Sequence, residues 1–385
     1  MKLLYCMASV YNPGGMERVL LNKLRWFSER TDYELVLVTT DQHGRAPFYE
    51  FPSSVKMIDL GVNYTDDNGK NAVVKTLGYL RRRRLHKKRL AAVLSAERPD
   101  ITISLYPSES SFIPSLRDGS KKVLELHLCK FFRLQYGRSG LYGLSDRLRT
   151  RQDERLVRRF DKFVVLTEED AGYWGNLPNL EVIPNAALKV GTGTGSESGS
   201  ASGYDVRSRR VIAVGRLDYQ KGFDRLLEAW ALLPESLRKD WHLDIYGQGE
   251  WEGMLKQMIL SLGISESAAI CKPTKRIFEE YGRSAFLVMS SHYEGFPMVM
   301  IEAMSCGLPV VCFDFKCGPK DIIVPGKNGF YVPEGDVAAL SAKMQELMLD
   351  DELRGSMSAA AAEISQTYSE DRIMEKWQNC FKSIL

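Results

Sequence analysis

Two glutamates, Glu294 and Glu302, lie eight residues apart in the segment EGFPMVMIEAMSCGLPVV. An apolar run of strand length, AFLVMSS, precedes Glu294, and the helical stretch that holds Glu302 begins after Pro297. This pattern places Glu294 at the carboxyl end of a strand, where open α/β sheets bind ligands. Helical side chains point toward the helix N-terminus, so the Glu302 carboxylate reaches the same crevice. Backbone N–H groups around Phe296 to Val299 suit an anion.

Two cations follow a second strand, VIAV, in the segment GRLDYQKG. Arg216 and Lys221 lie just past this strand, and a helix begins after Gly222. Cations beside a helix N-terminus can clamp a pyrophosphate. Such a clamp would stabilise the charge that develops on a diphosphate when its bond to a sugar breaks. The alternative is a pair of solvated surface cations.

The first half of the chain offers weaker signals. Gly14 and Gly15, in the segment NPGGMER, would let the backbone approach a ligand at the start of a helix, although an ordinary turn explains them equally well. His127 ends the predicted strand VLELHL and is either a core histidine or a group that faces a ligand. The other histidines lack metal-ligand spacing.

Short apolar runs alternate with helical stretches along the whole chain, which is typical of α/β proteins with parallel sheets. The predicted strands are 3–8, 34–40, 55–60, 101–106, 123–128, 162–167 and 180–184, then 210–217, 242–249, 268–273, 285–291, 309–313 and 330–333. The Gly/Ser-rich stretch 191–203 between the two series predicts a flexible loop at a domain boundary. Neither half has a dinucleotide-binding G-x-G-x-x-G fingerprint, which argues against a nicotinamide enzyme.

The bulk composition is that of a soluble globular enzyme. The 385 residues are 44% hydrophobic and 26% charged, and no apolar run reaches the roughly 18 residues of a membrane-spanning helix. The N-terminal apolar run has no signal-peptide cleavage pattern. Seven scattered cysteines without a C-x-x-C pair predict reduced thiols in a cytoplasmic protein.

Taken together, the EGFP…EAMSCGLPVV and GRLDYQKG segments resemble glycosyltransferase family 4, whose members retain anomeric configuration and have the GT-B fold. The resemblance implies an α/β protein of two facing Rossmann-like domains with parallel sheets and an interdomain cleft. We expect the first domain at 1–186 and the donor domain at 187–369. A C-terminal helix at about 370–385 should pack back on the first domain.

The resemblance also implies roles for the site residues. Glu302 would hold the donor ribose, and Glu294 would lie by the transferred sugar. Arg216 and Lys221 would form a metal-free clamp, in agreement with the lack of a D-x-D motif in this chain. His127 would contact the transferred sugar, and the loop at Gly14 and Gly15 would approach the donor phosphate. Further donor contacts are implied at Gly215, Gly247, Gly249, Lys272, Pro273, Gly295, Phe296, Pro297, Met298 and Val299.

The expected activity is transfer of a hexose or N-acetylhexosamine from a nucleotide diphosphate donor, UDP-linked, to a hydroxyl of a glycan or lipid-linked glycan. Such a reaction would serve the biosynthesis of polysaccharide, lipopolysaccharide or capsule, with no metal and no other cofactor. Two alternatives remain open: a nucleotide-sugar 2-epimerase on the same fold, and a catalytically inactive nucleotide- or glycan-binding protein. The sequence does not identify the sugar, the acceptor or the linkage.

The run LRRRRLHKKRL at 80–90 is the most basic part of the chain, with Arg81–Arg84 and Lys87–Arg89. It lies in the first 186 residues, where 30 Lys and Arg face 22 Asp and Glu. A solvated helix face, a nucleic-acid arm and a contact with an anionic membrane are the three interpretations. No aromatic residues interleave these charges, so we do not expect nucleic acid as a partner. A membrane contact would make the protein peripheral on the inner face.

Overall fold

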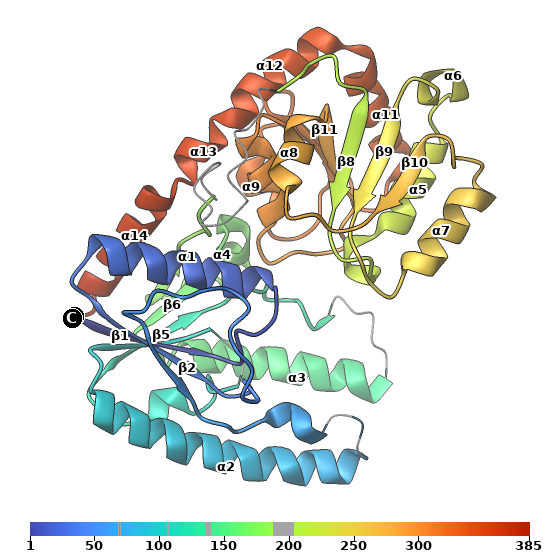
Figure 1. Ribbon diagram of the computed structural model, residues 1–385. Coiled ribbons are helices and arrows are strands. Elements are labelled where there is room, and N and C mark those ends of the chain that lie inside the picture. The colour runs from blue at the N-terminus through green and yellow to red at the C-terminus, as the bar shows by residue number, and fades with distance from the viewer. Residues whose placement is uncertain (68, 70, 106–107, 135–139, 188–203) are drawn as a thin grey trace. The chain divides into compact units, whose positions relative to one another are not determined.

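The computed structural model describes residues 1–67, 69, 71–105, 108–134, 140–187 and 204–385 (Figure 1). The chain divides into two compact units. Unit 1 comprises Met1–Leu166, Ala171–Ile183 and Ile373–Leu385, and unit 2 comprises Thr167–Asp170 and Pro184–Arg372. The Gly/Ser-rich stretch 191–203, for which we predicted a flexible loop, lies outside the described residues.

Unit 1 contains a parallel sheet of seven strands in the order β3-β2-β1-β4-β5-β6-β7. The strands are β1 (Lys2–Met7), β2 (Glu34–Thr39), β3 (Lys56–Asp59), β4 (Ile101–Ser104), β5 (Lys121–Glu125), β6 (Lys162–Val165) and β7 (Leu180–Val182). Helices cover both faces of the sheet, so its central strands are buried on both sides and read as continuous apolar runs.

The helices of unit 1 lie on opposite faces of its sheet, with α1 and α14 on one face and α2 on the other (Figure 1). They are α1 (Gly15–Arg30), α2 (Ala72–Glu97), α3 (Gly140–Val157), α4 (Glu168–Trp174) and α14 (Glu370–Lys382), with 3-10 turns η1 (Tyr64–Asp67) and η2 (Ile113–Ser115). The first residues of α4 and of α14 belong to unit 2. Asn71 caps α2 by accepting the Val74 N–H at 2.9 Å.

Unit 2 contains a parallel sheet of six strands in the order β10-β9-β8-β11-β12-β13. The strands are β8 (Arg210–Val214), β9 (His242–Tyr246), β10 (Ala268–Cys271), β11 (Phe286–Met289), β12 (Val310–Phe313) and β13 (Gly329–Val332). The helices are η4 (Tyr219–Lys221), α5 (Phe223–Ala231), α6 (Glu235–Arg238), α7 (Glu252–Ser261), α8 (Ile277–Gly282), α9 (Met298–Ser305), α10 (Pro319–Ile322), α11 (Val337–Leu349), α12 (Asp351–Ala362) and α13 (Ile364–Thr367).

Each predicted strand segment coincides with one of these strands, but the predicted ends run too far in several places. The clearest case is β5, which ends at Glu125, so His127 lies two residues past the strand instead of ending it. Strand order reverses between β1 and β4 in unit 1 and between β8 and β11 in unit 2. Ligands of such sheets bind at the carboxyl ends of the strands beside this reversal.

Candidate functional site

Lys221 and Glu294 form a nearly buried ion pair at the strand-order reversal of unit 2. Lys221 follows β8 and Glu294 follows β11, and the Lys221 Nζ lies 2.6 Å from the Glu294 Oε1. The side chains are only 15% and 8% exposed, respectively. Ser291 donates its hydroxyl to the same carboxylate oxygen at 2.7 Å. The carboxylate is therefore held in one orientation by two donors.

Two glycines allow the loop after β8 to reach this position. A Cβ on Gly215 would lie 3.0 Å from three carbons of the Lys221 side chain, so the lysine stem packs directly over this glycine. Gly222 has a φ of 58°, and a Cβ there would lie 2.4 Å from the Ser290 carbonyl oxygen. The Ser290 hydroxyl donates to the Lys221 carbonyl at 3.0 Å. The loops after β8 and β11 are thus fastened to each other.

Arg216 reaches the pair only through a neighbour. Its Nη2 donates to Gln220 Oε1 at 3.1 Å, and the Gln220 amide donates to the Tyr293 carbonyl at 3.1 Å and to Glu294 Oε2 at 3.4 Å. The Arg216 side chain is 71% exposed. Lys221 is held by the nearly buried Glu294, whereas the largely exposed Arg216 contacts its near neighbours Gln220 and Asp218, the latter at 3.4 Å.

Glu302 lies on α9 and is oriented by the neighbouring helix α8. The Tyr281 hydroxyl of α8 lies 3.5 Å from Glu302 Oε2. Tyr281 is fully buried, so its ring has a fixed position. Sequence reasoning named Glu302 but missed the tyrosine, which is far from it in the chain.

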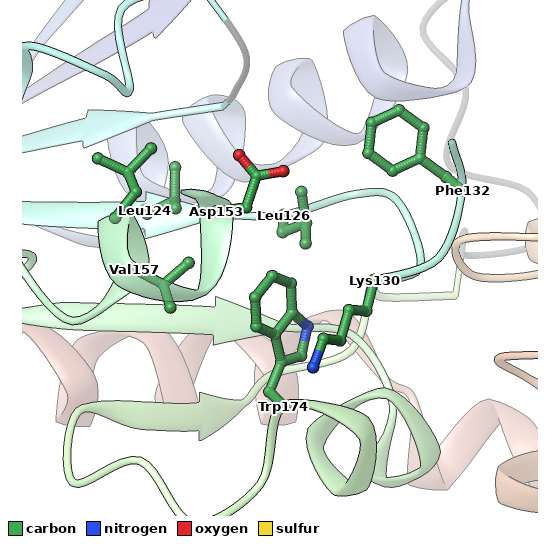
Figure 2. A pocket seen from close by; sticks show the side chains of 8 residues that line it. Leu124, Leu126, Lys130, Phe132, Asp153, Val157 and Trp174 are labelled. Atoms are coloured by element: carbon green, nitrogen blue, oxygen red, sulfur yellow. The ribbon is translucent and has the colours of Figure 1, made fainter. Parts of the chain in front are cut away.

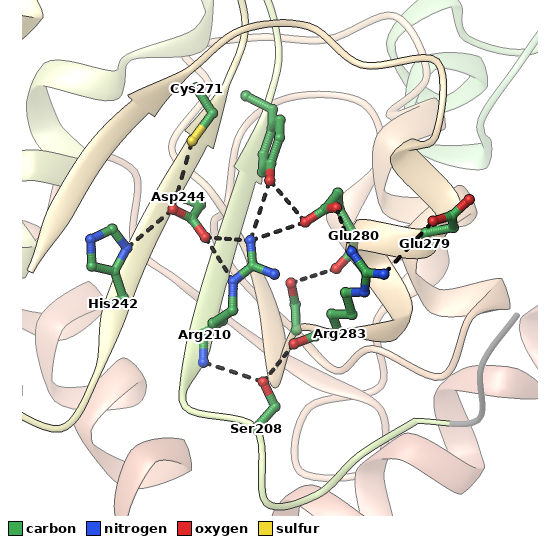
Figure 3. A network of polar contacts seen from close by, with 10 residues as sticks. Ser208, Arg210, His242, Asp244, Cys271, Glu279, Glu280 and Arg283 are labelled. Atoms are coloured by element: carbon green, nitrogen blue, oxygen red, sulfur yellow. Dashed lines mark hydrogen bonds and ion pairs between the residues drawn. The ribbon is translucent and has the colours of Figure 1, made fainter.

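A network of polar contacts holds α8 against the sheet (Figure 3). Arg210 of β8 donates to Asp244 of β9 at 2.6 Å and to Glu280 of α8 at 3.0 Å, and the Tyr246 hydroxyl donates to Glu280 at 2.8 Å. Burial opposes ionisation of both carboxyls, but His242 and Arg210 lower the pKa of Asp244, and Tyr246 and Arg210 lower the pKa of Glu280. Because Glu280 precedes Tyr281, this network fixes the helix turn that contacts Glu302.

Gly247 and Gly249 are explained by packing of the loop after β9 on the loop after β8. A Cβ on Gly247 would lie 2.0 Å from the Gly215 carbonyl oxygen, and one on Gly249 would lie 2.3 Å from the Leu217 carbonyl oxygen. Backbone bonds join the same loops, from Leu217 N–H to the Gln248 carbonyl at 3.0 Å and from Trp251 N–H to the Leu217 carbonyl at 2.9 Å. Their predicted contact with a diphosphate remains a prediction.

The remaining predicted donor contacts of unit 2 lie in two further loops. Lys272 and Pro273 are exposed and follow the edge strand β10. Gly295, Phe296 and Pro297 lead into α9, where Met298 and Val299 begin the helix. The Met298 N–H donates to the Phe296 carbonyl at 2.9 Å, so this N–H, expected to be available to an anion, is occupied in the structure.

In unit 1, Gly14 and Gly15 lie at the start of α1, after β1 at the strand-order reversal. A Cβ on Gly15 would meet no atom within 4 Å, and one on Gly14 would meet only the Glu17 side chain. Packing within the unit therefore does not require either glycine, unlike Gly247 and Gly249.

His127 is nearly buried and lies within hydrogen-bonding distance of the Glu125 carboxylate. Its Nε2 lies 3.0 Å from Glu125 Oε1, and the side chains are 6% and 1% exposed. Lys23 of α1 places its Nζ 2.5 Å from the same oxygen. Burial raises the pKa of Glu125, but Lys23 and His127 outweigh it and lower that pKa to about 2. Glu125 is therefore a carboxylate shared by two donors, which sequence reasoning did not identify.

None of these residues lines the small cavity of unit 1 that Figure 2 shows. Its lining is mainly apolar, with Leu124, Leu126 and Trp174, and the Lys130 side chain extends beside the Trp174 ring. Its volume of about 10 Å³ has room for no more than about one water molecule, so it is too small for a nucleotide or a sugar.

The structure thus brings Lys221 and Glu294 into contact and links Arg216 to them through Gln220. Ser291 and Gln220 are the partners that sequence reasoning missed in this group. Both lie within three residues of a predicted site residue, and this proximity was the signal that could have found them.

Comparison with known proteins relates this chain to glycosyltransferases. Residues 200–364, most of unit 2, match the family model described as glycosyl transferases group 1. The amylovoran biosynthesis glycosyltransferase AmsD of Erwinia amylovora is 35% identical over 226 residues, covering 57% of this chain and 61% of that protein. An uncharacterized glycosyltransferase of Haemophilus influenzae is 30% identical over 233 residues, covering 58% and 61%. The chain therefore spans about three fifths of the length of these curated relatives.

Solved structures match along the whole chain. TarM is 17% identical with a TM-score of 0.76, covering 99% of this chain and 98% of that one. Anabaena HepE, in complex with UDP and glucose, is 17% identical with a TM-score of 0.72 and full coverage of both chains. At these identities the likeness establishes the fold, and the prediction of a GT-B fold with two parallel sheets is confirmed.

Proposed function

We propose that this chain is a retaining glycosyltransferase of family 4. It transfers a hexose or N-acetylhexosamine from a UDP-linked donor to a hydroxyl of a glycan or lipid-linked glycan. The Lys221–Glu294 pair carries the proposal, because it is built at the ligand-binding edge of the unit that matches the family model. The name of AmsD, which refers to amylovoran biosynthesis, and the UDP and glucose bound to HepE support the substrate class.

The residues of unit 2 suggest how the reaction is assisted. An ammonium group has three N–H donors, so Lys221 can keep its bond to Glu294 and also bind a phosphate oxygen. The same carboxylate, held by Ser291, is available to the sugar. Arg216 adds a second cation as the donor binds. These cations stabilise the departing diphosphate, and this stabilisation makes the largest contribution to the rate. Glu302 holds the ribose of the donor.

Donor screening tests this proposal. Thermal shift with a panel of nucleotide sugars should show stabilisation by a UDP-sugar, and UDP should be released faster with a glycan acceptor than without one. A changed configuration of the sugar, without dependence on an acceptor, would indicate the epimerase. Binding with neither UDP release nor a change of the sugar would indicate an inactive binding protein. We also propose that Arg216 and Lys221 stabilise the diphosphate without a metal ion, so EDTA should leave turnover largely intact. Loss of turnover that a divalent metal restores would contradict this.

We further propose that unit 1 contacts an anionic membrane surface through one face of α2. Part of the basic run is used inside the unit: Arg82 pairs with Asp66 at 3.5 Å, and Arg89 donates to the Gly61 carbonyl at 2.9 Å. The exposed cations Arg81, Arg84 and Lys88 follow one another at helical spacing on one face. The exposed residues Leu77 and Leu80 continue this face toward the start of the helix.

Each basic residue near an anionic bilayer contributes roughly 1 kcal/mol, so the three together should give salt-sensitive binding. Among the described residues, no helix is long and apolar enough to cross a membrane. Replacing Arg81, Arg84 and Lys88 with serine should abolish cosedimentation with anionic vesicles. Serine at the exposed Arg117, Arg158 and Arg159, which lie outside α2, is the matched control. Equal binding to neutral vesicles, or equal losses in both triple variants, would refute the contact.

A further inference from the structure

Glu125 stands out among the buried charged groups of unit 1 because one of its oxygens serves two partners. Glu125 Oε1 lies 2.5 Å from the Lys23 Nζ and 3.0 Å from the His127 Nε2. All three side chains are less than 10% exposed. Isolated charges in such a position are costly, so their geometry must be kept by the surrounding elements.

We infer that Glu125 is a positioning residue for His127: it fixes the imidazole with its proton on Nε2 and presents Nδ1 as the nitrogen available to a ligand. This inference rests on the proposed function and on the role that the resemblance to family 4 implies for His127, contact with the transferred sugar. The Glu125 side chain is only 1% exposed, so we assign it no contact with the substrate.

The chemistry of the two groups sets this assignment. Glu125 is ionised and can only accept hydrogen bonds, so the nitrogen that faces it must carry the proton. In the neutral ring the other nitrogen, Nδ1, is then an acceptor, suited to a sugar hydroxyl. Without the carboxylate the ring could exchange its tautomer and lose this acceptor.

Lys23 also contacts α14, the last helix of the chain. Its Nζ lies 3.7 Å from the centroid of the Trp377 ring on α14. The lysine is thereby held between a carboxylate of β5 and an aromatic ring of the last helix. The Lys23–Glu125 ion pair is thus supported by α1, near the start of the chain, and by α14, near its end. A carboxylate that positions another residue needs such rigid support.

Nitrogen NMR of the full chain tests the inference without any substrate. The ring ¹⁵N shifts of His127, assigned with His127→Gln, should report the Nε2–H tautomer in the wild type. Glu125→Gln should shift the ring toward the Nδ1–H form or a mixture. Glu181→Gln is the matched control, because it breaks a strand Glu–Lys pair of the same unit, with Lys162 at 2.9 Å, that does not involve His127. An Nδ1–H ring in the wild type, or an unchanged ring in Glu125→Gln, would overturn the inference.

If Glu125→Gln fails to fold because Lys23 loses its partner, the double variant Glu125→Gln with Lys23→Met removes both charges and should still show the tautomer change. In turnover assays we expect Glu125→Gln to lower kcat by about 10- to 100-fold, by analogy with the loss of a carboxylate that orients a metal-ligating histidine, while the affinity for UDP stays unchanged. A wild type that neither binds UDP-sugars nor releases UDP would refute the proposed function, whereas the NMR result decides the role of Glu125 separately.

Discussion

At the scale of single residues, Lys221 and Arg216 share a predicted role but differ in their surroundings. Lys221 is held against Glu294, and Arg216 extends into solvent. Replacing Lys221 with alanine leaves a nearly buried carboxylate without its cation, which costs about 2–3 kcal/mol of stability. Arg216→Ala should change stability by less than about 0.5 kcal/mol. Both variants should lower kcat by about 100-fold or more.

Melting curves and initial rates measured on the same preparations check this contrast. Lys239→Ala is the control, because its ion pair with Glu235, at helix α6, is exposed and involves no predicted site residue. The assignment fails if Arg216→Ala destabilises the protein as much as Lys221→Ala, or if either variant retains wild-type turnover.

Glu302 allows a second prediction at this scale. A carboxylate bonded to ribose hydroxyls is worth about 1.5–3 kcal/mol, so Glu302→Ala should weaken UDP binding by about 10- to 150-fold. Calorimetric titration with UDP measures this directly, with Glu252→Ala on α7, a partly exposed glutamate, as the control. An unchanged affinity would remove Glu302 from the donor site.

At the scale of elements, the close packing of two loops positions the cations after β8. Gly247→Ala would place a Cβ against the Gly215 carbonyl and force the loops apart, which should cost about 1–3 kcal/mol and also reduce turnover. Gly253→Ala, in helix α7 with no atom within 4 Å of the added carbon, should instead stabilise by about 0.5–1 kcal/mol. Denaturant titration of both variants compares them. Equal stabilities would show that the loops have room to adjust.

The helix α8 illustrates a second way in which an element supports the site. Its Glu280 is fixed to the sheet by Arg210 and Tyr246, and the next residue, Tyr281, approaches Glu302. A helix of six residues has little stability of its own, so these tertiary contacts hold it in place.

At the scale of the whole molecule, the chain leaves unit 1 after Ile183 and returns to it at Ile373. On its return, α14 places Trp377 beside Lys23 and Phe381 beside Phe27, with ring centroids 6.0 Å apart in the second pair. Removing residues 373–385 should therefore destabilise unit 1 selectively.

Hydrogen exchange measured by mass spectrometry tests this expectation. Amides of α1 and β5 should lose protection in the truncated chain, whereas those of β8 and β11 should keep it. A chain that lacks only the exposed Leu385 is the control. Uniform loss of protection in both units, or no loss in either, would contradict the role of α14.

The sequence alone determined the strands, because parallel strands buried on both faces are continuous apolar runs that local patterning reveals. It also indicated Glu294, Glu302, Arg216 and Lys221, since their motifs follow strands and precede helices. The predicted end of β5 was wrong, because the apolar pattern of the chain continues past Glu125, the last residue of the strand.

Only the tertiary structure decided which of these residues meet. Lys221 and Glu294 are 73 residues apart, and Lys23 and Glu125 are 102 apart. Their contacts depend on strand order, which places β8 beside β11 and puts β4 alone between β1 and β5, so that Lys23 of α1, the helix after β1, reaches Glu125 of β5. Local periodicity reports whether a segment is buried but not which segment is its neighbour, so the pairing of these charges follows from the fold.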